Sequence, residues 1–146
     1  MSQSGSSSLN AKLTDFGYSR WLAPQEATSL IYLPNSGFWT APEHHHRGFD
    51  FVAATKSDVY SFGVYALWLL FYNTTGSDND FTSDTSDLEQ RPVIELARSH
   101  VRGMVGAPNE QKAVLGQILE LCLASEPEHR SPMGDILLLF QSALYV

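Results

Sequence analysis

The sequence is poor in cysteine and in basic residues. Only one of its 146 residues is cysteine, and nine lysine and arginine residues stand against 16 aspartate and glutamate residues. Cys122 therefore has no partner for an internal disulfide, and its apolar neighbours predict a buried, reduced thiol, as in an intracellular, cytoplasmic protein. The net charge of -7 gives no general attraction to nucleic acid or anionic lipid. We therefore expect neither nucleic acid nor a membrane surface as a partner.

Secretory and membrane-spanning segments are lacking as well. Residues 1–10 are polar and serine-rich, with neither the basic start nor the apolar stretch of a secretory signal, so we interpret them as a disordered leader. The longest uncharged apolar run, 59–72, is shorter than the roughly 20 residues that cross a bilayer. This run is expected to be a helix in a protein core.

The core helix has a predicted start. Thr55 and Asp58 have the spacing of a capping box, in which side chains satisfy the exposed backbone N–H groups of a first turn. The pattern predicts a helix over about 56–72. Because its surface is apolar or aromatic in nearly every direction, we expect other elements to cover it on several sides.

Shorter elements are predicted before and after this helix. Residues 11–14 indicate a short strand, and 18–40 lack any sustained period, which favours a long loop. Residues 74–89 carry acidic but no basic side chains, as expected of a flexible insert. Helical spacing then recurs over about 92–145 in three stretches: from Pro92 to near Gly103, from a cap at Asn109, and from Ser131 with Pro132 in the first turn.

Three short motifs follow one another along the chain. Asp15-Phe16-Gly17 alone would indicate little more than a turn. Ala41-Pro42-Glu43 follows it, and then Asp58-Val59-Tyr60-Ser61-Phe62-Gly63 at the core helix. In this order the motifs resemble those of the eukaryotic protein kinase family over roughly 11–145.

The resemblance implies a fold and a domain organisation. The fold would be mainly α, a truncated kinase carboxy-terminal lobe in which a helical bundle surrounds a buried central helix and the small lobe is absent. Residues 11–146 would form the partial kinase domain, with an activation segment over 15–43.

It also implies roles for individual residues. Asp15 matches the aspartate that holds magnesium on the phosphates of ATP, because a hard cation prefers carboxylate oxygens. Phe16, followed by Gly17, resembles the ring that packs inward in that family. Glu43 and Arg130 would form a desolvated, fork-shaped ion pair with a structural role. Asp58 resembles an aspartate that receives hydrogen bonds from the catalytic loop.

The predicted activation segment contains several hydroxyl groups that could accept a phosphate. The candidate phosphosites are Ser19, Thr28, Ser29, Tyr32 and Ser36. Trp39 is similar to the tryptophan of tyrosine kinases, whereas Ser36 stands where serine/threonine kinases carry threonine. The residues from Lys56 to Gly63 weakly favour a resemblance to tyrosine-kinase-like serine/threonine kinases. The sequence does not settle which type of residue in the substrate accepts the phosphate.

Parts that a working kinase needs are missing from the sequence. It contains no glycine-rich loop, no lysine paired with an acidic helix residue, and no catalytic loop. We therefore expect the chain to be inactive alone. The alternative is a non-catalytic, kinase-derived module that binds a partner protein, and an uncovered flank of the core helix would also favour self-association.

The histidine run His44-His45-His46 has two interpretations. Imidazoles bind zinc and nickel, but three consecutive residues on a helix point in different directions. A solvated helix after Glu43 is therefore the favoured interpretation.

Overall fold

The described residues form four α-helices and three short 3-10 helices. The computed structural model describes residues 12–14, 16–19, 30–34, 36–45, 48, 50–71 and 93–144. Within these ranges there is no extended strand, and the prediction of a mainly α fold is confirmed. The predicted leader at 1–10, the acidic insert at 74–89 and Asp15 lie outside the described residues.

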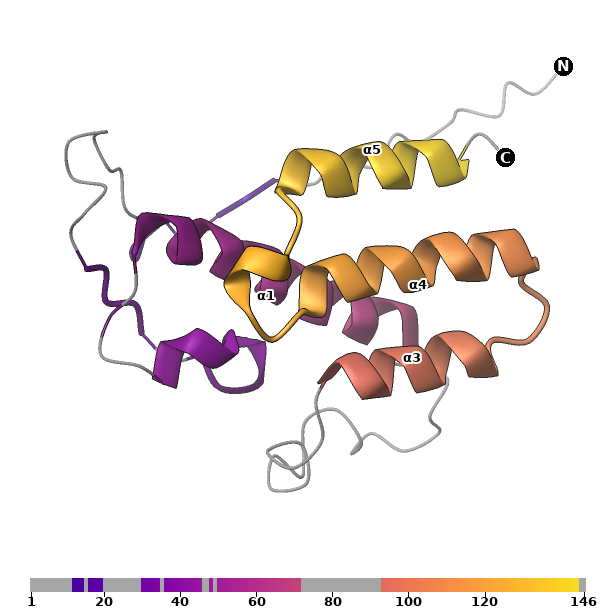
Figure 1. Ribbon diagram of the computed structural model, residues 1–146, viewed down its shortest axis with the longest axis horizontal. Helices are drawn as coiled ribbons and strands as arrows, with labels where there is room; N and C mark the ends of the chain where they lie inside the picture. The colour runs from indigo at the N-terminus through magenta and orange to yellow at the C-terminus, as the bar shows by residue number, and fades with distance from the viewer. Residues whose placement is uncertain are drawn as a thin grey trace, which may run out of the picture.

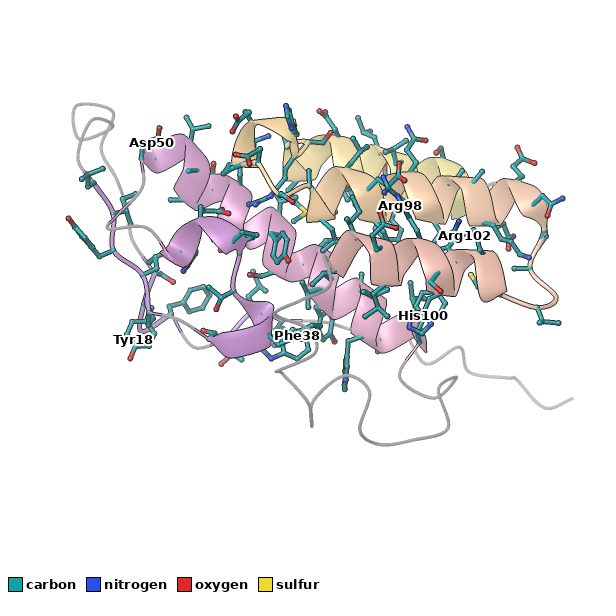
Figure 2. The ribbon with its side chains drawn as sticks, turned by 60° about the horizontal axis from the view of Figure 1, so that its bottom comes forward. Tyr18, Phe38, Asp50, Arg98, His100 and Arg102 are labelled. Atoms are coloured by element: carbon teal, nitrogen blue, oxygen red, sulfur yellow. The ribbon has the colours of Figure 1, made fainter. Side chains whose placement is uncertain are left out.

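Helix α1, Phe51–Phe71, begins one turn earlier than the sequence pattern predicts. The carboxylate oxygen Oδ1 of Asp50 accepts a hydrogen bond from the backbone N–H of Ala53 over 2.8 Å, so Asp50 caps the helix. Figure 2 shows Asp50 at this end of α1. The predicted capping box at Thr55 is wrong, because Thr55 lies inside the helix and donates its hydroxyl to the carbonyl of Val52.

The predicted strand over 11–14 is not present in its described part. Lys12, Leu13 and Thr14 adopt no regular secondary structure, and the Leu13 side chain is exposed. A strand requires a neighbour that pairs with its backbone N–H and C=O groups. No described segment pairs with residues 12–14, so local propensity alone does not produce a strand there.

Three helices follow in the second half of the chain, at the places where helical spacing recurs. They are α3, Val93–Gly103, α4, Asn109–Leu123, and α5, Met133–Leu144. Asn109 is the first residue of α4 and not its cap: Pro108 holds the cap position without a side-chain hydrogen bond. Ser131 likewise lies outside α5, and the carbonyl of Pro132 accepts the first backbone hydrogen bonds of that helix.

Helix α4 lies between α3 and α5, and α1 crosses behind it (Figure 1). The core lies where these helices meet, and Val64, Leu67, Ile118, Leu119 and Ile136 are among its most buried side chains. Helices α1 and α4 approach closely at Gly63, where an added Cβ would lie 2.5 Å from Cβ of Cys122. The expected burial of the Cys122 thiol is confirmed, and this burial raises its pKa to about 12.

The described helices give no membrane-spanning candidate: none of them combines the necessary length with sufficient apolar character.

Candidate functional site

A buried ion pair joins two segments that are far apart in sequence. Nη1 of Arg130 lies 2.6 Å from Oε1 of Glu43, and Nη2 lies 2.7 Å from Oε2. The two contacts form the parallel fork that a guanidinium makes with a carboxylate. Arg130 is only 1% exposed and Glu43 is also buried. The ion pair therefore has the desolvated, two-contact geometry that the sequence comparison predicts.

The remaining donors of Arg130 are used by backbone carbonyls. Nε donates to the carbonyl of Ala124 over 2.8 Å, Nη1 to Lys56 over 3.1 Å, and Nη2 to Ser125 over 2.9 Å. A guanidinium has five N–H groups, and Arg130 makes five hydrogen bonds in total. A buried charge with every donor satisfied does not incur the desolvation cost of an unpaired ion.

Helix α1 supports this ion pair from two further positions. The guanidinium carbon of Arg130 lies 4.9 Å from the ring centroid of Tyr60, which adds a cation–π contact. Lys56 donates its ammonium to the carbonyl of Arg130. Burial raises the pKa of Tyr60 and the Glu43 charge raises it further, while the Arg130 charge opposes both.

Two serines one turn apart on α1 hold the segment that precedes and contains Glu43. Oγ of Ser57 lies 2.5 Å from Nε2 of His44, and Oγ of Ser61 donates to the carbonyl of Trp39 over 2.8 Å. Ser57 and Ser61 share a face because residues four apart align on a helix. Residues 39–44, which include all but the last residue of η3 (Pro42–His45), are thereby fixed to α1 at both ends.

Aromatic side chains also attach the segment before α1 to that helix. Trp39 belongs to the 3-10 helix η2, Gly37–Trp39, and its ring packs edge to face on Trp68 of α1, with centroids 6.1 Å apart. Phe38 packs on Trp39 in the same manner at 5.5 Å. Edge-to-face contacts of this kind add to the stabilisation from apolar burial. Trp39 and Trp68 therefore serve as packing residues.

A groove of about 470 Å³ lies between residues that precede α1 in the sequence and the first half of α1. Its lining residues are Tyr18, Ser19, Ile31, Leu33, Pro34, Ser36, His44, Phe51, Ala54, Thr55, Ser57, Asp58 and Ser61. Among the lining residues that the structure describes, Asp58 is the only carboxylate and none is a lysine or arginine. Figure 2 shows Tyr18 at the end of the molecule remote from Arg98.

The Asp58 carboxylate is exposed to solvent, yet its electrostatic environment is altered. Partial desolvation raises the pKa of Asp58, and the nearby His44 charge opposes the shift. Within the described residues, no hydrogen bond or ion pair is made by the Asp58 side chain. A carboxylate in this position can accept hydrogen bonds from a segment that enters the groove.

The first motif is only partly described. Asp15 lies outside the described residues, and the backbone N–H of Ser19 donates to the carbonyl of Phe16 over 3.0 Å, which closes a turn at Gly17. The Phe16 side chain is 66% exposed. The expected inward packing of this ring is therefore absent, because no described side chain covers it.

The candidate phosphosites fall into different environments. Ser19 and Ser36 line the groove, whereas Tyr32 is 65% exposed and does not line it. Thr28 and Ser29 lie outside the described residues.

The histidine run adds one described contact. His44 lies in a 3-10 helix and its Nε2 contacts Ser57, while His46 lies outside the described residues. In the described part of the chain, no group of three or more metal-ligating side chains comes together.

Comparison with known proteins identifies the family. The sequence model of protein tyrosine and serine/threonine kinases matches residues 6–140. The chain belongs to the protein kinase family. No solved structure matches the chain.

Relatives within this kinase family include both acceptor classes. A receptor-like serine/threonine-protein kinase of Arabidopsis thaliana is 27% identical over 143 residues, which cover 91% of this chain and 39% of the relative. The cytoplasmic tyrosine-protein kinase BMX of Mus musculus is 27% identical over 131 residues, 90% of this chain and 18% of BMX. An inactive leucine-rich repeat receptor-like serine/threonine-protein kinase of Arabidopsis thaliana is 32% identical over 135 residues, with 90% and 20% coverage. The chain thus spans well under half the length of these kinases.

Sequence reasoning missed the two serines that hold the kinase segment before α1. Ser61 stands in the third motif without a predicted role, and Ser57 lies between the two residues of the predicted capping box. Their signal was their spacing, since two hydroxyls four residues apart mark a polar stripe on an otherwise apolar helix. Their partners could not be inferred, because no sequence pattern connects the short 3-10 helices of Trp39 and His44 with α1.

Proposed function

We propose that this chain forms the carboxy-terminal part of a protein kinase domain that transfers the γ-phosphoryl group of ATP to protein hydroxyls. Phosphoryl transfer would require a nucleotide-binding lobe and a catalytic loop, neither of which occurs in the 146 residues. Alone, the chain is expected to be inactive. Its own contribution would be the activation segment and the helical support beneath it.

The observation that carries this proposal is the Glu43–Arg130 ion pair. It connects the end of the proposed activation segment to the loop before α5, and all five donors of Arg130 are satisfied. Such a pair fixes the geometry of a segment that must present a protein substrate. Removing either partner would leave a buried charge without compensation.

The groove beside Asp58 supports a second part of the proposal. Partial desolvation without a described donor makes this carboxylate a suitable acceptor for backbone N–H groups. A catalytic loop that docked into the groove would supply those donors. Asp58 would then position the loop without touching the transferred phosphate.

The first motif, Asp15-Phe16-Gly17, is the part of the chain that would contribute to binding magnesium and ATP. Asp15 would provide a carboxylate oxygen for Mg²⁺, and the metal would neutralise charge on the phosphates during transfer. A single carboxylate is a weak magnesium site, so we expect tight binding only when phosphates and a second protein ligand are present.

A chimeric kinase tests the proposal. Residues 12–144 would replace the corresponding segment of the related mouse tyrosine kinase and, separately, of the Arabidopsis serine/threonine kinase. We expect phosphate incorporation from ATP, and identification of the phosphorylated residue would report the acceptor class. Asp15→Asn in the same chimera is expected to abolish incorporation. A folded chimera that is inactive with Asp15 intact would contradict the proposal.

The same phosphorylation assay on the isolated chain is the counterpart of the chimera experiment. We expect no incorporation above background with Mg-ATP and a mixture of serine, threonine and tyrosine peptides. Incorporation by the purified chain that is lost in Asp15→Asn would show that the missing parts are not required.

The alternative function, a binding module without catalysis, would rest on one observation. Tyr65, Leu69 and Leu70 expose large apolar surface on α1, and Leu137 and Leu138 do so on α5. Exposed apolar patches promote association. We propose that the chain self-associates through this surface or binds a partner protein there. Light scattering of the wild type and Leu69→Lys tests self-association, and a monomeric wild type would rule it out.

A further inference from the structure

Residues 30–34, which we call the strap, contribute one wall of the groove beside α1. Ile31 and Leu33 line the groove from the strap, and Phe51 lines it from the first turn of α1. Burial alternates along the strap: Ile31 is buried, whereas Leu30 and Tyr32 on either side of it are exposed. Ile31 therefore belongs to the groove, and its two neighbours lie outside the groove lining.

A close contact with Gly48 holds the strap near the start of α1. A Cβ added at Gly48 would lie 3.0 Å from Cζ of Tyr32 and 3.2 Å from Cβ of Leu30. Both distances are shorter than an ordinary van der Waals contact between two carbon atoms. Because Cβ of Leu30 is bonded directly to the backbone, a side chain at Gly48 would have to displace the strap itself. The contact therefore depends on glycine.

The backbone of Gly48 also favours glycine, because its φ is +91°. Asp50, whose carboxylate caps α1, follows two residues later. The strap thus rests on the stretch of backbone that leads into the helix cap.

The strap buries much less apolar surface than the helical core. Of the three residues around the Gly48 contact only Ile31 is buried, whereas α1 alone buries Val59, Val64 and Leu67 among others. Opening of the strap would expose one buried apolar side chain, while separation of the helices would expose many. Segments that bury little apolar surface open at a lower free-energy cost than the whole molecule.

We infer that the strap opens and closes at the beginning of α1 while the helical core stays folded, and that its contact with Gly48 holds it closed. In the closed state Tyr32 and Leu30 pack on Gly48, and the groove keeps both of its walls. In the open state Ile31 and Phe51 become accessible, so the strap controls access to the groove. This conformational change involves no phosphoryl transfer, and it is tested independently of the proposed function.

Thiol labelling distinguishes opening of the strap from unfolding of the chain. In the complete 146-residue chain, Ile31→Cys places a thiol at the buried position of the strap, and the natural Cys122 lies fully buried in the core. Both thiols are modified with iodoacetamide, and the two rates are followed by mass spectrometry of the peptides. We expect modification at position 31 to be about tenfold or more faster than at Cys122, because the strap opens without the core.

Gly48→Ala, added to Ile31→Cys, tests the point of closure. We expect the rate at position 31 to rise about tenfold or more, because the new methyl group displaces the strap. Gly106→Ala is the matched control: its φ is +83°, but an added Cβ would meet nothing within 4 Å. This control should change the rate at position 31 by less than about twofold. The rate at Cys122 should rise to a similar extent in both variants, since each places alanine at a positive φ.

Equal rates at position 31 and at Cys122 in the chain with Ile31→Cys alone would overturn the inference, because the strap would then open only on global unfolding. A rate at position 31 that is the same in Gly48→Ala and Gly106→Ala would also overturn it. Should Ile31→Cys itself keep the strap from closing, so that labelling there is already at its maximum, Leu33→Cys decides the same two comparisons at a second position in the groove wall.

Discussion

The two faces of α1 are almost equally apolar, yet only one of them is covered. Val64 and Leu67 are 0% exposed against the neighbouring helices, whereas Leu69 is 60% exposed and Tyr65 and Leu70 are also open to solvent. The covered face meets α4 at Gly63 and receives Arg130 at Tyr60. Identical residue types therefore have different energetic roles depending on which element lies opposite.

This difference shows the limit of periodicity as a guide. In α3, charged and apolar residues alternate at helical spacing, so its sequence indicates which face is buried. In α1, apolar residues occur on all sides of the helix, so its sequence does not indicate which face is buried. Substitutions that compare the two faces test the distinction directly.

The largest effect is expected at the buried ion pair. Arg130→Ala would leave Glu43 as a buried charge and should lower the free energy of unfolding by about 3–5 kcal/mol. Arg98→Ala is the matched control, because Arg98 makes solvent-exposed ion pairs with Glu95 on its own helix and with Glu120 on α4. Figure 2 labels Arg98. Arg98→Ala should leave the urea midpoint nearly unchanged. Equal losses in the two variants would mean that burial of the pair is unimportant.

The leucines of α1 compare its faces most directly. Leu67→Ala removes a fully buried side chain and should cost about 2–5 kcal/mol of unfolding free energy. Leu69→Ala, two residues further on, should change it by less than about 0.5 kcal/mol. Chemical denaturation measures both. A large loss at Leu69 would indicate that its face is covered in solution.

Gly63 tests the closeness of α1 and α4. In Gly63→Ala the new Cβ would lie 2.5 Å from Cβ of Cys122 and 2.9 Å from Cδ2 of Leu123, and overpacking should cost about 1–3 kcal/mol of unfolding free energy. Gly116→Ala on α4 is the control, since its Cβ would meet only Val101 at 3.7 Å. That variant should gain up to about 1 kcal/mol from helix propensity. A stabilised Gly63→Ala would show that the helices can separate without cost.

At neutral pH the smallest effect is expected at Cys122, which contributes a pH dependence only in alkaline solution. Burial raises its pKa to about 12, so the native state favours the neutral thiol. The unfolded thiol ionises first, near its ordinary value, and stability should therefore be constant below about pH 8 and fall between about pH 9 and 12. The slope should approach about 1.4 kcal/mol per pH unit relative to Cys122→Ala. Parallel pH profiles of the two proteins would contradict this contribution.

Much of the candidate site was accessible from sequence because its motifs are local. Three short motifs in a fixed order predicted the family, and the family comparison predicted the contact of Glu43 with Arg130 across 87 positions. The helix start at Asp50 was missed because Thr55 and Asp58 offered a second set of capping side chains. Phe16 was expected to pack inward, but a ring packs only where other side chains surround it.

The amino-acid sequence by itself determined the family, the order of the helices and the chemical character of the residues at the ion pair. Local patterns carry this information because capping, helical spacing and motif residues depend on near neighbours in the chain. Only the tertiary structure decided which face of α1 is covered, which carbonyls saturate Arg130, and that Ser36 and Asp58 share a groove. These outcomes depend on how distant segments pack. Because α1 is apolar on every side, its buried face is set by the elements that pack against it.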